Sequence, residues 1–124
     1  MLQILPLRDK TELIKLYGKS NIELKNNCMA VSAVCDDEII GYALFSLDKQ
    51  IVIYDLQPRE DIPLADGILR AALHVAVENG VLEARYQNTG LKPILKRLRF
   101  IQNDDKCTLN IEKLFSSCQS CENT

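Results

Sequence analysis

The sequence has no tryptophan, one histidine and five glycines among its 124 residues. It also lacks any apolar run near the roughly 20 residues that span a bilayer, so we expect no contact with membranes. The net charge of −2 provides no overall positive field for nucleic acid. The first residues, "MLQILPLRDK", lack the basic start and long apolar core of a secretory signal, so we expect a cytoplasmic protein.

What is present is the composition of a folded domain. The hydrophobic fraction is 47% and the charged fraction 26%, close to the average of globular proteins. A chain of 124 residues favours one domain, and we predict that it covers residues 1–115 and is followed by a polar tail over 116–124. The five cysteines are odd in number and no export signal accompanies them, so we expect mostly free thiols.

The first half of the chain reads as one strand, one helix and three further strands. The run "QILPL" is typical of an edge strand, and "RDKTELIKLYGKS" has the apolar spacing of a helix. The segments "CMAVSAVC", "IIGYALFSL" and "IVIYDL" are separated by the turn signals "DDE" and "DKQ". They predict a meander of antiparallel strands.

The second half begins with a strong helix, "PLADGILRAALHVAVENG". Its polar residues Asp66, Arg70, His74 and Glu78 recur every four positions, so the remaining wide apolar arc is expected to cover the sheet. A strand in "VLEARYQN", a short helix in "LKPILKRLRF" and a closing hairpin in "FIQNDDKCTLNIEKLF" follow. We predict an α/β (α+β mixed) fold: a mostly antiparallel sheet of six or seven strands flanked by about three helices.

This order of elements resembles the GNAT superfamily of N-acetyltransferases over roughly residues 1–115. The step Ile40–Gly41–Tyr42 looks like the family's third strand, and "YDLQP" looks like the end of its fourth. Asn88 precedes Phe100 by twelve residues, which is the spacing of the family's late segment. The resemblance implies acetyl-CoA or CoA as co-substrate, bound between the fourth and fifth strands, and acyl transfer to a small-molecule or protein amine.

The resemblance also implies positions for the site. The family uses a base on its fourth strand or a water chain, and Asp55, at the end of this strand, would be that base or an acid that caps the turn. The family's late tyrosine falls on Leu95, so Tyr86 would either replace it as proton donor to the leaving thiolate or be a half-buried packing residue. The coenzyme would contact the strand end and the start of the long helix, and Asn88 would either bond its pantetheine arm or stabilise the strand-to-helix turn. The residues at these two places are Leu56, Leu64, Ala65, Asp66, Gly67 and Ile68.

The chain departs from the family's coenzyme loop at three positions. The family's arginine falls on Asp61, and its two key glycine positions fall on Leu64 and Asp66. One alternative is therefore a self-capped helix that starts near Pro63 and fills its own anion site with carboxylates. The function alternative is a catalytically inactive GNAT-fold module that acts through a protein partner.

Two further residues are acid–base candidates beside Asp55. They are Tyr54 and Glu60, although Tyr54 and Asp55 would point to opposite faces of a regular strand. The acceptor would be recognised by the variable front segment, residues 11–27. A homodimer paired through edge strands is compatible with the sequence.

The remaining motifs have simpler interpretations. Lys92, Lys96, Arg97 and Arg99 either contact coenzyme phosphates or form a solvated helix face, which we favour. His74 is expected to face solvent. Cys118-x-x-Cys121 is half of a zinc or redox site, and we predict no metal because no second pair of ligands accompanies it.

Overall fold

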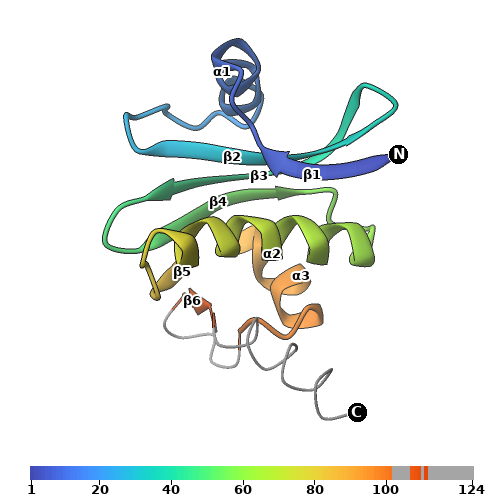
Figure 1. Ribbon diagram of the computed structural model, residues 1–124. Helices are drawn as coiled ribbons and strands as arrows, with labels where there is room; N and C mark the ends of the chain where they lie inside the picture. The colour runs from blue at the N-terminus through green and yellow to red at the C-terminus, as the bar shows by residue number, and fades with distance from the viewer. Residues whose placement is uncertain (102–106, 110, 112–124) are drawn as a thin grey trace.

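The computed structural model describes residues 1–101, 107–109 and 111. The elements in chain order are β1 (Leu2–Pro6), α1 (Lys10–Lys19), β2 (Cys28–Cys35), β3 (Glu38–Leu47), β4 (Ile51–Gln57), α2 (Ile62–Glu78), β5 (Ala84–Tyr86), the 3-10 turn η1 (Thr89–Leu91), α3 (Lys92–Arg97) and β6 (Thr108–Leu109). Figure 1 shows their arrangement, with β1 to β4 between α1 and α2 in this view and with β5 and β6 below α2.

The six strands follow one another across the sheet in chain order. All neighbours are antiparallel except β4 and β5, which are parallel because α2 connects them. This confirms the predicted mixed, largely antiparallel sheet with three helices. Strand β4 therefore has an antiparallel neighbour, β3, on one side and a parallel neighbour, β5, on the other.

The strand sequences bury both faces of the sheet. Val31, Ala43 and Phe45 belong to the larger core under α2. Ala30 and Leu44, which alternate with them, belong to a smaller core under α1. Alternating side chains on a strand point to opposite faces, so two separate cores follow directly from strands that are apolar on both sides.

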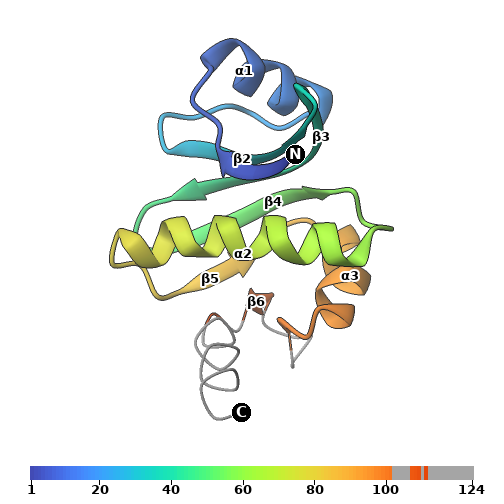
Figure 2. The same ribbon diagram turned by 45° about the vertical axis from the view of Figure 1, so that its right-hand side comes forward.

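The long helix α2 covers the larger core. Its buried residues are Ala65, Ile68, Leu69, Ala72, Leu73 and Ala76, which recur at helical spacing. His74 is exposed, as its place in the polar row predicts. Figure 2 shows α2 lying along β4 and β5, with α3 below the N-terminal part of α2 in this view.

Tyr17 ties α1 to the opposite face. Its hydroxyl lies 2.6 Å from the carbonyl oxygen of Met29 and 2.9 Å from that of Phe45. Burial raises the pKa of the Tyr17 phenol, because the ionised form would lose its water. The end of α1 is thereby fixed against β2 and β3, and this positions the loop that follows it.

The predicted closing hairpin is wrong in its first arm. Phe100 and Ile101 are buried but are not part of a strand, and β6 pairs with β5 instead. The reason lies at the end of α3: Arg99 adopts a positive φ of 64°, and the N–H of Phe100 donates to the carbonyl of Leu95 at 3.0 Å. Phe100 therefore closes a helix rather than starting a strand.

Some predictions fall outside this description. The "NDDK" turn and the tail, including Cys118 and Cys121, lie beyond the described residues. Within the residues that are described, no helix has the length and apolar character needed to cross a membrane.

Candidate functional site

A cleft of about 920 Å³ opens at the end of β4, on the side of the sheet that carries α1. One wall is the end of α1 and the loop after it, from Lys19 to Lys25. This segment belongs to the front region that was predicted to recognise the acceptor. The floor and opposite wall come from β3, the end of β4 and the residues after β5, including Asn88. Segments far apart in the sequence thus meet at one place.

A β-bulge brings two candidate side chains into this cleft. The pairing of β3 with β4 passes from Leu44–Asp55 to Phe45–Ile53, which leaves Tyr54 as the extra residue. Tyr54 and Asp55 both line the cleft, whereas a regular strand would send them to opposite faces. The Tyr54 hydroxyl donates to Ser46 Oγ at 2.9 Å.

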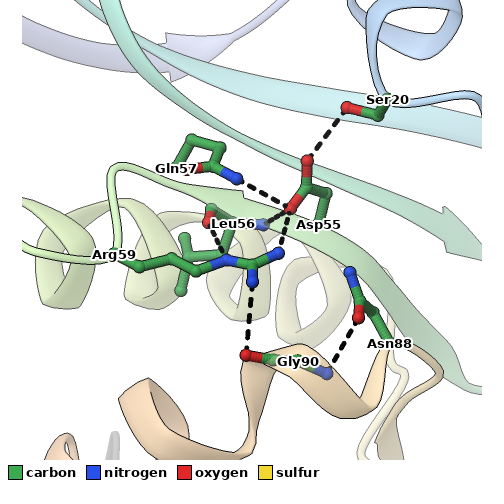
Figure 3. A network of polar contacts seen from close by, with 7 residues as sticks. All are labelled: Ser20, Asp55, Leu56, Gln57, Arg59, Asn88 and Gly90. Carbon is green, nitrogen blue, oxygen red and sulfur yellow. Dashed lines mark hydrogen bonds and ion pairs between the residues drawn. The ribbon is translucent and has the colours of Figure 1, made fainter.

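Asp55 is the centre of the polar contacts in Figure 3, and only 6% of it is exposed. Its Oδ2 accepts a hydrogen bond from Ser20 Oγ at 2.9 Å. Its Oδ1 accepts bonds from Leu56 N at 2.9 Å, Gln57 Nε2 at 3.3 Å and Arg59 Nη2 at 2.9 Å. A buried carboxylate requires such partners, and here Arg59 supplies the compensating charge.

Arg59 reaches across from the end of β4 to η1. Its Nε donates to Leu56 O at 3.3 Å, and its Nη1 donates to Gly90 O at 3.2 Å. Figure 3 shows the guanidinium between these two carbonyls and the Asp55 carboxylate. With one side chain, Arg59 joins two segments that are 31 residues apart.

Sequence reasoning missed both Arg59 and Ser20. Ser20 lies 35 residues before its partner Asp55, so no local pattern connects them. Arg59 follows Asp55 by four residues. This spacing brings two side chains together on a helix, but it predicts no contact where a strand runs into a loop. Their roles arise from tertiary structure.

Asn88 lies two residues after β5, immediately before η1. Its Oδ1 accepts a hydrogen bond from Gly90 N at 2.9 Å and so caps η1. This is the turn-stabilising role that was one of its two predicted roles. Asn88 also lines the cleft, so contact with a ligand stays a prediction.

The start of α2 does not offer a free anion site in this conformation. The helix begins at Ile62, as the self-capped alternative expects, and Asp61 is its N-cap. The Asp61 side chain accepts from Leu64 N at 3.3 Å, and the Asp61 carbonyl accepts from Ala65 N at 2.9 Å. A pyrophosphate here would have to displace these acceptors, so the fit of coenzyme phosphates to this helix end is poor.

The other predicted coenzyme residues on α2 face elsewhere. Ile68 is fully buried in the core, and Asp66 pairs with Arg70 at 2.8 Å on the helix surface. A Cβ added at Gly67 would come within 3.1 Å of Ile4 Cδ1, so this glycine has a packing reason: it lets α2 approach β1. Coenzyme contact by these residues stays a prediction.

Tyr86 is buried in the core under α2, with 2% of it exposed, and it is not among the residues that line the cleft. The basic residues of the last helix also lie away from the cleft: Lys96, Arg97 and Arg99 are exposed and Lys92 is half-buried. Glu60 is exposed and outside the lining. Of the acid–base candidates, the structure therefore brings Asp55 and Tyr54 together.

Metal ligands do not gather in the part of the chain that is described: no group of three or more histidine, cysteine, aspartate or glutamate side chains could hold an ion there. Cys28 is buried, and Cys35 and Cys107 are half-buried free thiols.

No protein-family model and no curated protein sequence matches the chain. Solved structures do match. The ribosomal-protein-S18-alanine N-acetyltransferase from Escherichia coli has a TM-score of 0.60 at 11% identity, over 83% of this chain and 79% of that one. A putative streptothricin acetyltransferase from Bacillus anthracis, in complex with acetyl coenzyme A, has a TM-score of 0.59 at 14% identity, over 82% of both chains.

A putative acetyltransferase of the GNAT family from Desulfovibrio desulfuricans has a TM-score of 0.58 at 14% identity, over 83% of this chain and 87% of that one. These identities are low, so the likeness concerns the fold.

Proposed function

We propose that this protein, which has the GNAT fold, is an acyl-CoA-dependent N-acyltransferase that transfers an acetyl or other acyl group to an amine. One observation carries the proposal. The bulge in β4 places a buried carboxylate residue, Asp55, and Tyr54 side by side in the lining of a cleft that is large enough for a small substrate. The likeness to acetyltransferases supports the reaction class by analogy of fold.

Asp55 supplies the proton acceptor. Alkyl amines are protonated near neutral pH, so an amine must lose a proton before its lone pair can attack a carbonyl carbon. Asp55 Oδ1 already accepts three hydrogen bonds, whereas Oδ2 accepts one, from Ser20. Oδ2 therefore has the spare lone pair, and the Ser20 hydroxyl beside it can accept the amine's proton while passing its own to Oδ2.

The acceptor is a polar amine, either a small molecule or a protein side chain. The front wall presents Lys19, Glu23 and Lys25 to the cleft, and Tyr42 and Tyr54 provide apolar ring surface. Such a wall suits a ligand that has several hydrogen-bonding groups and a short apolar segment.

The second candidate is a GNAT-fold module without enzymatic activity, which acts through a protein partner. The Asp61 cap favours it, because the N-terminal end of α2 already carries its own carboxylate. Exposed residues of the front segment would then contact a partner rather than hold a substrate.

Turnover and ligand binding together separate the two candidates. The protein is incubated with acetyl-CoA and a panel of small polyamines, amino acids and lysine peptides, and the release of free thiol is followed. We expect release with at least one amine, and loss of turnover in Asp55→Asn with CoA affinity no weaker than that of wild type. Glu60→Gln, at an exposed position outside the cleft, is the matched control. Equal turnover in Asp55→Asn would contradict the role of Asp55.

A further inference from the structure

The edge of β4 beyond the bulge is open on the side of β5. Backbone pairing between the two strands runs from Ile51–Ala84 to Ile53–Tyr86, and Gln87 N then donates to Ile53 O at 3.0 Å. Past this point the connection between β4 and the next segment is made by a side chain. Arg59 links Leu56 O to Gly90 O.

The guanidinium is well matched to this place. Three of its nitrogens donate to three different oxygens, and one of the bonds is an ion pair with Asp55. A planar guanidinium can hold several acceptors in a fixed fork, which an ammonium cannot do. About a third of the Arg59 side chain is exposed (34%), so it can leave without unpacking the core.

We propose that Arg59 is a strap that closes the opening between β4 and η1, and that acyl-CoA enters only when Arg59 releases Leu56 O and Gly90 O. This inference rests on the proposed function. The pantetheine arm of CoA is an extended chain with two amide groups. An extended amide chain binds an open strand edge by donating its N–H groups to the strand's carbonyls. Leu56 O is such a carbonyl, and Arg59 occupies it.

The strap gives the protein two states, closed and open. A ligand that binds only the open state has its apparent dissociation constant raised by the reciprocal of the open fraction. If the open state is about 1–10% populated, weakening the strap tightens CoA binding roughly ten- to one-hundredfold. Arg59 then limits how readily the site is filled, and a partner that draws Arg59 away would activate the protein.

The test is the dissociation constant of CoA, measured by titration calorimetry on the full chain. Arg59→Met removes every donor and keeps most of the volume. Arg59→Lys keeps the charge but cannot bridge both carbonyls. Arg85→Met, at an exposed position of β5 outside the cleft, is the matched control for loss of one arginine.

We expect Arg59→Met to bind CoA about tenfold or more tightly than wild type, Arg59→Lys to be intermediate, and Arg85→Met to match wild type. Should Arg59→Met fail to fold, the test is whether Arg59→Lys binds CoA more tightly than wild type. CoA binding that is equal or weaker in the Arg59 variants overturns the strap but leaves the proposed function standing. Absence of binding in every variant at millimolar CoA overturns both.

A second readout does not depend on CoA. In the closed state the Arg59 Nε–H donates to Leu56 O, so its NMR resonance should be protected from exchange with water near neutral pH. The signal is assigned by its loss in Arg59→Met. We expect saturating CoA to abolish the protection. A resonance that exchanges freely without ligand, or that stays protected in the CoA complex, overturns the strap.

Discussion

Two aspartate–arginine pairs lie on either side of the start of α2, and each spans four residues. Asp66 and Arg70 pair on the surface of the helix at 2.8 Å, with 33% and 27% of their side chains exposed. Asp55 and Arg59 pair at 2.9 Å where β4 ends, and only 8% of the Asp55 side chain is exposed. The same residue types at the same spacing therefore make one surface contact and one buried junction.

The surroundings of each pair decide how much it stabilises the folded protein. On a helix, residues four apart are neighbours, so the Asp66–Arg70 pair is local, and both of its side chains are half-buried. The Asp55–Arg59 pair forms because the chain leaves the sheet after β4, and it recruits Ser20 and Gly90 from other segments. Burial and shared partners, rather than distance, separate the two pairs.

Asp55→Ala should give the largest effect. It removes the acceptor of Ser20, Arg59 and Leu56 N together and leaves a partly buried cation without its carboxylate. We expect the free energy of unfolding in urea to fall by about 2–4 kcal/mol. Asp66→Ala, the matched change, should cost no more than about 0.5 kcal/mol. Equal losses in the two variants would mean that the two pairs are equivalent.

Gly41→Ala should give the next largest effect, because it disturbs the segment that carries Arg59 and does not disturb the Asp66–Arg70 pair. A Cβ at Gly41 would lie 2.6 Å from Ile68 Cδ1, 2.8 Å from Gln57 O and 2.9 Å from Pro58 Cδ. We expect a loss of about 1–3 kcal/mol in the free energy of unfolding. Gly18→Ala is the control: apart from its chain neighbours and the backbone of its own helix, nothing lies within 4 Å of the added Cβ. Alanine is also favoured over glycine in a helix, so a similar loss there would refute the steric reason.

Ser20→Ala should have a smaller effect that depends on Asp55. The variant removes one hydrogen bond to a carboxylate, which corresponds to about 1–2 kcal/mol. Measured again in an Asp55→Ala background, the same substitution should cost much less, because its partner is already gone. Strict additivity in this double-mutant cycle would show that the 2.9 Å contact does not contribute to stability.

Salt should produce the smallest change and should affect the two pairs unequally. Raising NaCl from about 0.1 to 1 M shortens the screening length from roughly 10 to 3 Å and weakens exposed ion pairs most. Coupling energies from double-mutant cycles of each pair at both salt concentrations test this. We expect the Asp66–Arg70 coupling to fall towards zero while the Asp55–Arg59 coupling persists. The reverse order would overturn the contrast in burial.

Much of the fold could be predicted from sequence because its signals are local. The alternating strands from Cys28 to Gln57 and the polar row of α2 have clear periods, and the structure has both. The closing hairpin was misplaced because Phe100 and Ile101 look like strand residues. Their β-propensity did not decide the conformation, because Phe100 N donates a hydrogen bond to Leu95 O at the end of α3.

The site was less predictable, because it depends on an irregularity and on distant contacts. Asp55 was found because it ends a strand, but a regular strand gave the wrong expectation that Tyr54 would face away from it. The bulge that brings them together leaves no mark in the sequence of β4. Ser20 and Arg59 obtain their roles only from the folded chain.

The Asp61 cap has a further consequence, which concerns competition. A carboxylate attached to the helix it caps is present at an effective concentration on the order of millimolar or above, whatever the protein concentration. Any soluble anion that seeks the same N–H groups must outcompete this built-in ligand. Helix stability and anion affinity therefore depend on one residue in opposite directions, so a change at Asp61 that loosens α2 would also open its N-terminus to solutes.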